Sequence, residues 1–133
     1  MKKVLEQELV DLRSKLKFSF DTGEIWLGEN RMMLMHVSAM GAFRNEMIQS
    51  LGLERARGLL VRLGYASGVQ DAALAKSLPS NGSPEAGVML GPMLHSFKGM
   101  VRVEKRKLEI DIPKGKFSGE FVWENSWEAQ THL

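Results

Sequence analysis

The sequence predicts a single domain of α+β class, in which an amino-terminal β-hairpin, central helices and a carboxy-terminal antiparallel hairpin follow one another. Near both ends, apolar residues alternate with polar ones, which is the two-residue period of a strand. In the middle they recur every three or four residues, which is the period of a helix. The 133 residues suffice for one hydrophobic core, and no internal repeat divides them.

The first hairpin is predicted inside an amino-terminal arm, residues 1–30. Phe18 and Phe20 alternate with polar neighbours. Asp21-Thr22-Gly23 is a turn signal, and Ile25-Trp26-Leu27 resumes an extended apolar run. Two strands joined by a tight turn are the simplest account of this pattern.

Two helices are expected in the next part of the chain. Ser38 is the expected N-cap of the first, because its hydroxyl can accept a hydrogen bond from an unpaired backbone N–H. Gly52 separates this helix from the second. The second is expected to run toward Leu78, although Gly64 and Gly68 lower its helix propensity.

A third helical segment begins with a strong start signal. Ser83-Pro84-Glu85 combines a cap, a proline at the first helical position and an acidic residue near the positive end of the helix dipole. The segment that follows, residues 88–95, is apolar nearly all round. Its Gly91-Pro92 pair is expected to kink it or split it into two short helices. Lys98-Gly99 is a C-terminal signal.

The remainder of the chain is predicted to be a β-hairpin with a helix start after it. Residues 107–112 alternate charged and apolar side chains, and Pro113-Lys114-Gly115 supplies the turn. In residues 117–123 the aromatic side chains share one face of a strand. Asn125-Ser126-Trp127-Glu128 resembles a capping box. The chain stops within that helix, so we expect it to be the front part of a larger sensor domain.

Composition argues against several partners. The net charge of +2 is mild, and the basic run Arg102–Lys107 contains an acid and no aromatic, so a solvated strand edge is favoured over a nucleic-acid patch. No apolar run approaches the roughly 20 residues that span a bilayer. The absence of cysteine and the acidic residues near the start fit a cytoplasmic protein that is not exported.

Motifs of the common enzyme classes are missing. The chain has no phosphate-binding glycine loop, no dinucleotide fingerprint and no Gly-x-Ser-x-Gly. His36, His95 and His132 are too widely spaced to be metal ligands on one helix turn. The sequence therefore predicts a protein that is not an enzyme.

Two residues have a chemistry that suits a small ligand. His95 lies in an apolar segment, where it is either a core histidine with a satisfied hydrogen bond or a ligand contact. Trp123 shares a strand face with Phe121 and carries one N–H donor. If His95 and Trp123 converge, they suit a phenol, which is flat and apolar with one polar point. The nine methionines fill a core or line an adaptable pocket.

Several motifs, in order along the chain, resemble the XylR-type amino-terminal domain of sigma-54-dependent activators of aromatic catabolism. The resemblance covers the chain from about residue 18 to residue 133. The motifs are Ile25–Met32, Arg55–Gly58, Arg62–Gly68, Gly91–His95, Gly119–Trp123 and Ser126–Ala129.

The resemblance, to the phenol-responsive members in particular, implies a ligand-sensing domain and a set of site residues. In those members a histidine and a tryptophan hydrogen-bond the hydroxyl of the effector, and their positions match His95 and Trp123. Phe121 matches a pocket wall, and Val88 and Phe97 match further lining. The expected ligand is phenol or a related small aromatic, whose binding relieves repression of a downstream ATPase domain.

The resemblance also implies partners and missing parts. Family members are homodimers, partly through the arm at residues 1–30. A 4-vinyl-reductase-like subdomain follows in the family, with a cysteine-rich zinc site and the rest of the pocket. We therefore expect residues 1–133 to form part of a sensor domain with no cofactor of its own, no direct nucleic-acid contact and no membrane contact.

Two alternatives stay open. In the first alternative, the chain is a dimerisation or structural module that binds no ligand. In the second it is a small enzyme that uses His95 as an acid or base, although no second titratable group is positioned by sequence to assist.

Overall fold

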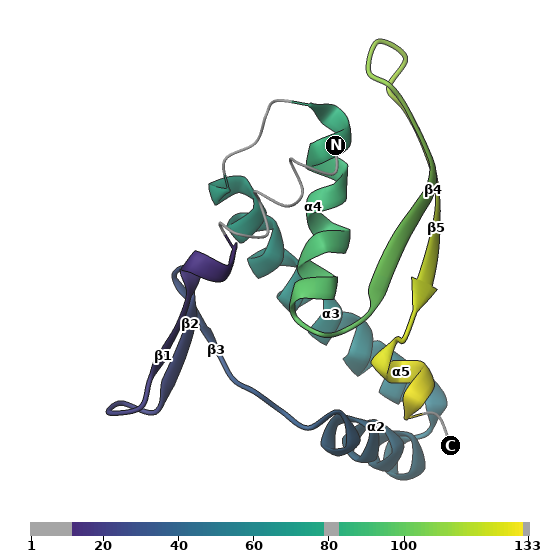
Figure 1. Cartoon of the computed structure of the whole chain (residues 1–133). Coiled ribbons are helices and arrows are strands. Elements are labelled where there is room, and N and C mark those ends of the chain that lie inside the picture. The colour runs from purple at the N-terminus through teal and green to yellow at the C-terminus, as the bar shows by residue number, and fades with distance from the viewer. Residues whose placement is uncertain (1–11, 79–82, 132–133) are drawn as a thin grey trace.

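Strands and helices occupy separate stretches of the computed structural model, which describes residues 12–78 and 83–131 (Figure 1). A helical turn and a three-stranded sheet come first, three long helices follow, and a two-stranded hairpin and a short helix come last. This order confirms the α+β class with a hairpin at each end.

The first sheet is antiparallel and contains β1 (Leu16–Ser19), β2 (Glu24–Leu27) and β3 (Asn30–Met32), in that order. The predicted hairpin is β1 and β2. Gly23 and Gly28, with φ of 69° and 61°, take the left-handed conformation that glycine adopts without strain in the two tight turns. The second turn adds β3, which the sequence interpretation did not foresee.

Two helices follow, α2 (Val37–Leu51) and α3 (Leu53–Ser77), and they pack on each other. The expected cap at Ser38 is wrong. The backbone N–H groups of Ala39 and of the residue after it both donate to the carbonyl of His36, so the helix begins earlier and Ser38 lies within its first turn. The second helix runs unbroken through Gly64 and Gly68, as expected.

Helix α4 (Pro84–Phe97) begins as predicted, since the Ser83 hydroxyl accepts a hydrogen bond from the N–H of Ala86 at 3.4 Å. Of the two expectations for Gly91-Pro92, a kink or a split, the split is wrong, because one helix continues through Pro92. Leu90 and Leu94 lie on either side of the proline and are almost fully buried. Their packing against the core offsets the hydrogen bond that the proline removes.

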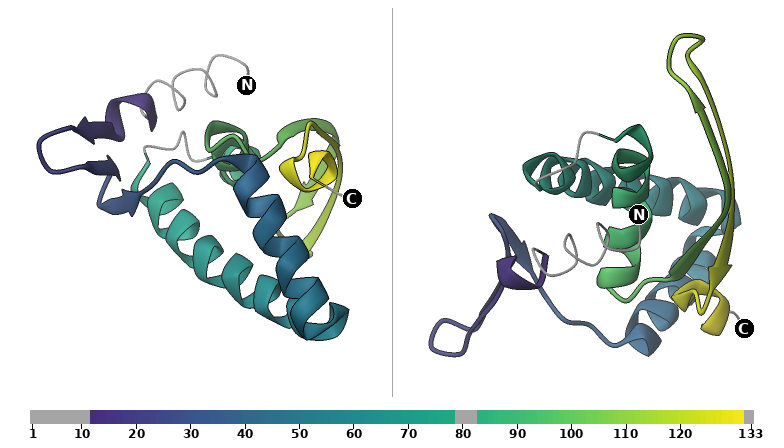
Figure 2. Two further views of the ribbon diagram at one scale, coloured as in Figure 1. Left: turned by 90° about the horizontal axis from the view of Figure 1, so that it is seen from below. Right: turned by 45° about the horizontal axis from the view of Figure 1, so that its top comes forward.

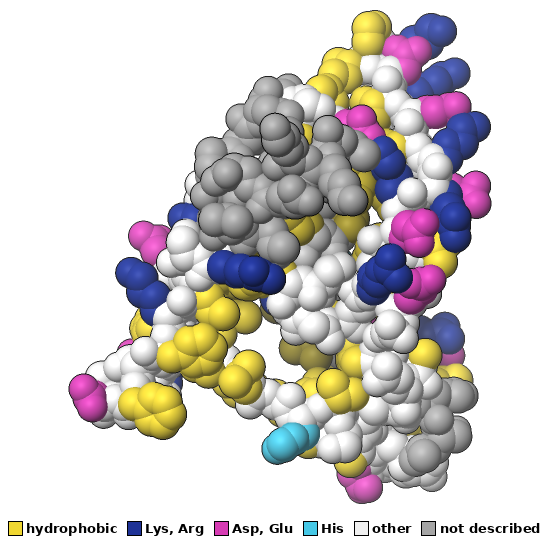
Figure 3. Space-filling view, viewed as in Figure 1, with side chains coloured by type: hydrophobic (Ala, Val, Ile, Leu, Met, Phe, Trp, Pro, Cys, Tyr) yellow, Lys and Arg dark blue, Asp and Glu magenta, His cyan; other side chains and the backbone are white. Residues whose placement is uncertain are grey.

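The second sheet pairs β4 (Arg102–Asp111) with β5 (Lys116–Glu124) in an antiparallel hairpin that extends away from the helices (Figures 1 and 2). Charged side chains follow its outer edge (Figure 3). The basic run of β4 is paired with acids, for example Arg102 with Glu124 at 2.6 Å and Lys105 with Glu85 of α4. These ion pairs fit the solvated hairpin edge that composition favoured.

The hydrophobic core joins the first sheet to α3 and α4. Its fully or nearly fully buried members are all leucines: Leu12, Leu27, Leu74, Leu78, Leu90 and Leu94. Among the described helices, none is long and apolar enough to cross a membrane.

The last helix, α5 (Trp127–Gln130), docks on α2 at a glycine. Its N-cap is Ser126, whose hydroxyl accepts from the N–H of Ala129 at 3.2 Å, as the capping pattern predicted. A Cβ atom on Gly41 would lie 2.5 Å from the Cβ of Thr131, so only glycine allows this close approach.

Replacing this glycine therefore has an effect opposite to that of an open helical glycine. Gly58 of α3 has no atom within 4 Å of a built Cβ, so Gly58→Ala is expected to raise the free energy of unfolding by about 0.5–1 kcal/mol. Gly41→Ala gains the same helix propensity but forces an overlap with Thr131 that costs about 1–3 kcal/mol. Urea unfolding of both variants measures the difference, and equal stabilisation would contradict the close docking of α5.

Candidate functional site

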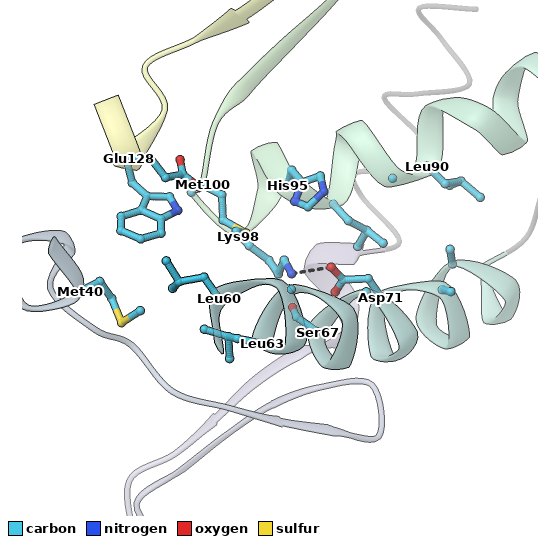
Figure 4. Close-up of a pocket in the computed structure, with 18 of the residues that line it drawn as sticks. Met40, Leu60, Leu63, Ser67, Asp71, Leu90, His95, Lys98, Met100 and Glu128 are labelled. Carbon is cyan, nitrogen blue, oxygen red and sulfur yellow. Dashed lines mark hydrogen bonds and ion pairs between the residues drawn. The ribbon is translucent and has the colours of Figure 1, made fainter. Parts of the chain in front are cut away.

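A cavity of about 1180 Å³ lies between α3 and α4, with residues of α2 and α5 at one end (Figure 4). Most of its lining is apolar. Labelled examples are Met40 of α2, Leu60 and Leu63 of α3, Leu90 of α4 and Met100 after it. Pockets for drug-sized ligands measure roughly 300–1,000 Å³, so a single aromatic ring fills only part of this space.

Several polar groups of the cavity lie between α3 and α4. His95 of α4 lies half-buried above them, and Ser67 of α3 lies below (Figure 4). Between them, the ammonium of Lys98 lies 2.6 Å from a carboxylate oxygen of Asp71. The two side chains are only 12% and 20% exposed, so this ion pair is largely removed from water.

Contacts between α2 and α5 lie at one end of the cavity. The guanidinium of Arg44 lies over the ring of Trp127 at 5.3 Å, a cation–π contact. The same group donates to the carbonyl of Glu128 and the hydroxyl of Thr131, both at 3.1 Å. Arg44, Trp127 and Glu128 all line the cavity, so this contact forms its end wall.

Three of the five predicted site residues come from α4. His95 and Val88 line the cavity and are half-buried. Phe97 does not line it, but packs against the leucine core as a partly buried side chain. An apolar helix with one histidine was therefore a sound signal for a cavity wall.

The other two, Phe121 and Trp123 on β5, are not brought to this cavity. Phe121 is half-buried opposite Lys105, whereas Trp123 lies opposite Val103 and is 66% exposed. The expectation that the rings of His95 and Trp123 converge in one cavity is thus not met within residues 12–78 and 83–131. The physical reason is that β5 belongs to a hairpin that packs on α4 through β4 and extends away from the helices.

The sequence interpretation did not single out Lys98 and Asp71, two of the charged residues that line the cavity. Lys98 was predicted only as part of a helix end, and no role was predicted for Asp71. A local signal was present in the spacing of these residues. Lys98 follows His95 by three residues and Asp71 follows Ser67 by four, so Lys98 lies beside His95 and Asp71 lies beside Ser67 on a helix surface. That Lys98 and Asp71 pair with each other is a tertiary contact.

The described side chains do not form a metal site. Among them, no three His, Cys, Asp or Glu residues lie close enough together to hold an ion. No residue of this part of the chain is therefore assigned to the zinc that the resemblance places in a following segment.

Comparison with known proteins shows the family of the chain. A family model described as "Activator of aromatic catabolism", XylR_N, matches residues 11–111. The chain belongs to this family. Members of the XylR_N family are regulatory sensory domains, and the prediction that the chain is not an enzyme is confirmed.

Relatives of the chain agree with this family. It is 41% identical over 134 residues to the phenol regulator MopR of Acinetobacter guillouiae and 41% identical over 127 residues to the transcriptional regulatory protein XylR of Pseudomonas putida. The alignments cover 99% and 96% of this chain but only 24% and 22% of the relatives. The chain thus spans about a quarter of their length.

A solved structure shares the fold. The phenol-responsive sensory domain of the transcription activator PoxR, crystallised with phenol, superimposes with a TM-score of 0.87 and is 45% identical. The match covers 96% of this chain and 64% of the PoxR chain. A substantial part of that sensory domain therefore has no counterpart in these 133 residues.

Breaking the buried ion pair is expected to cost more than breaking an exposed one. Asp71→Asn leaves the Lys98 ammonium without a counter-charge and should lower the free energy of unfolding by about 1–3 kcal/mol. Glu124→Gln breaks the pair with Arg102, whose side chains are 41% and 65% exposed, and should cost less than about 1 kcal/mol. Chemical denaturation of both variants tests this, and equal losses would contradict the burial of the Lys98–Asp71 pair.

Proposed function

We propose that the chain is the front part of the cytoplasmic effector-sensing domain of a transcription activator, and that its effector is phenol or a related small aromatic. The observation that carries this proposal is the mostly apolar cavity with His95 on its wall, in a chain that shares its fold with a phenol-responsive sensory domain. Binding would bias the domain between two states and so relieve repression of a downstream ATPase domain.

The chemistry of the cavity suits such a ligand. Leucines and methionines offer apolar contact to a flat ring, and methionine adapts to rings of different substitution. The imidazole of His95 either donates or accepts a hydrogen bond, so it can pair with one hydroxyl. Val88, about two helix turns before His95, lines the same cavity, and Phe97 supports the helix that carries both.

We propose that Phe121 and Trp123 join the ligand only when a further segment packs on the hairpin. The face of β5 that carries them is apolar, and Trp123 and Phe117 are 66% and 58% exposed. Exposed apolar surface of this kind marks an interaction site. The unmatched part of the PoxR sensory domain supports a following 4-vinyl-reductase-like subdomain as that segment. The zinc of the family would belong to it.

Homodimerisation through the arm at residues 1–30 is also proposed. Residues 1–11 of the arm lie outside the described part of the chain. In the described part, Phe18 and Phe20 on the first hairpin are 59% and 100% exposed. Two exposed phenylalanines on one hairpin support a contact with a second copy.

A dimerisation or structural module without ligand binding is the second candidate. The exposure of Trp123 favours it, because the proposed partner of the hydroxyl faces solvent in this chain. This candidate predicts no saturable binding of phenol or toluene to the full-length protein. Titration calorimetry with both compounds separates it from the sensing function.

The role of His95 is tested by the difference between two ligands. His95→Ala in the full-length protein is expected to weaken phenol binding about tenfold or more, because the hydroxyl loses its partner, and to change toluene binding less. Isothermal calorimetry with both ligands measures the two losses. His36→Ala is the control, since His36 lies before α2 and outside the cavity lining. Equal losses of affinity for phenol and toluene would show that His95 does not recognise the hydroxyl.

Trp123 is expected to contribute to phenol affinity only when a further segment packs on the hairpin. In the full-length protein, Trp123→Phe should weaken phenol binding about tenfold and toluene binding less, because only the indole N–H is lost. Tyr65→Phe is a matched control, since Tyr65 is 77% exposed and lies on α3. An unchanged phenol affinity in Trp123→Phe would exclude Trp123 from the site.

A further inference from the structure

The Lys98–Asp71 ion pair joins α4 to α3 at a position where apolar contacts would also hold the two helices together. Both side chains line the apolar cavity, and both also line a smaller neighbouring cavity of about 430 Å³ beneath β2 and β3. The pair therefore stands between two hollow spaces and is not enclosed by packed side chains.

The Lys98–Asp71 pair has hydrogen-bond donors and acceptors that the ion pair itself does not use. An ammonium has three donors and a carboxylate accepts through both oxygens. Within the described residues, the bond between Lys98 and one oxygen of Asp71 is the hydrogen bond these two side chains make. Buried polar groups seek partners, so the remaining donors and acceptor can receive a polar group from a guest.

The pair also lies within reach of a ring held at His95. Lys98 follows His95 by three residues at the end of α4, and side chains at that spacing are neighbours on a helix. Figure 4 shows the ammonium, the carboxylate and the imidazole in the same part of the cavity. Since the volume of the cavity is larger than one aromatic ring fills, a ligand can extend from His95 toward the Lys98–Asp71 pair.

We propose that Lys98 and Asp71 form a second polar recognition point, which selects aromatic effectors that carry a second hydroxyl or similar polar substituent. This inference rests on the proposed sensing function. One substituent pairs with His95, and the second pairs with the spare donor of Lys98 or the spare oxygen of Asp71. A site with buried hydrogen-bonding groups discriminates against a guest that leaves them unpaired, because the guest displaces water without replacing its bonds.

The test replaces the pair by apolar residues of similar size, since such replacement of a buried pair commonly preserves the fold. The double variant Asp71→Leu/Lys98→Met of the full-length protein is titrated with phenol, catechol, resorcinol and hydroquinone. The ratio of affinities, dihydroxybenzene to phenol, is expected to fall about tenfold for at least one isomer. A purely structural pair would alter all four affinities alike.

Two further variants complete the test. Arg102→Met/Glu124→Leu removes an exposed ion pair outside the cavity and should leave every ratio unchanged. Lys98→Arg keeps the charge and the ion pair with Asp71 but moves the hydrogen-bond donors. The ratio of affinities between at least two of the three dihydroxybenzene isomers should therefore change by about threefold or more, and this variant gives a result even if the double variant does not fold.

The outcomes separate the two proposals. Binding of phenol with ratios that neither cavity variant changes overturns the second recognition point and leaves the sensing function intact. No binding of any of the four compounds to the unaltered protein overturns both. A lower ratio in Asp71→Leu/Lys98→Met, or a changed ranking in Lys98→Arg, supports the second recognition point.

Discussion

The packing of leucines between the first sheet, α3 and α4 is the constraint on which the rest of the structure depends. Three of these leucines, Leu78, Leu90 and Leu94, belong to the core and also line the cavity. The same side chains therefore fix α3 against α4 and form one wall of the site. Because a close-packed core resists deformation, this wall is rigid.

The opposite end of the cavity is held in a different way. There, α2 and α5 meet through Gly41 and Thr131 and through the stacking of Arg44 on Trp127. These are few contacts near the surface, and such contacts open at a lower free energy than a leucine core. A guest that crowds the cavity is thus accommodated at the end formed by α2 and α5, and the wall formed by α3 and α4 stays in place.

Local signals in the sequence predicted local structure well. Of the three predicted helix caps, those at Ser83 and Ser126 were correct and the one at Ser38 was wrong. The expected split at Pro92 failed because burial of the leucines around it outweighs one lost hydrogen bond. His95 was recognisable from its apolar neighbours. Its charged companions were not, because Lys98 and Asp71 lie 27 residues apart and meet only through the packing of α4 on α3.

The position of Trp123 depends on the hairpin rather than on the helices. The hairpin is anchored at its base, where Val101 is buried and the N–H of Trp127 donates to the carbonyl of Met100 at 3.0 Å. Trp123 pairs with Val103, two residues from Val101, so it lies close to this anchored base and its exposure is set by what covers the face of β5.

Under the proposed function, His95 is fixed by α4, and Trp123 lies on an exposed strand face that a further segment would cover. A ligand shifts a conformational equilibrium only by its difference in affinity for the two states. A hydroxyl bonded to both His95 and Trp123 makes its second bond only in a state that brings the exposed ring of Trp123 to the ligand, whereas a bare ring makes its apolar contacts without that bond. The hydroxyl thereby contributes to the switch as well as to affinity.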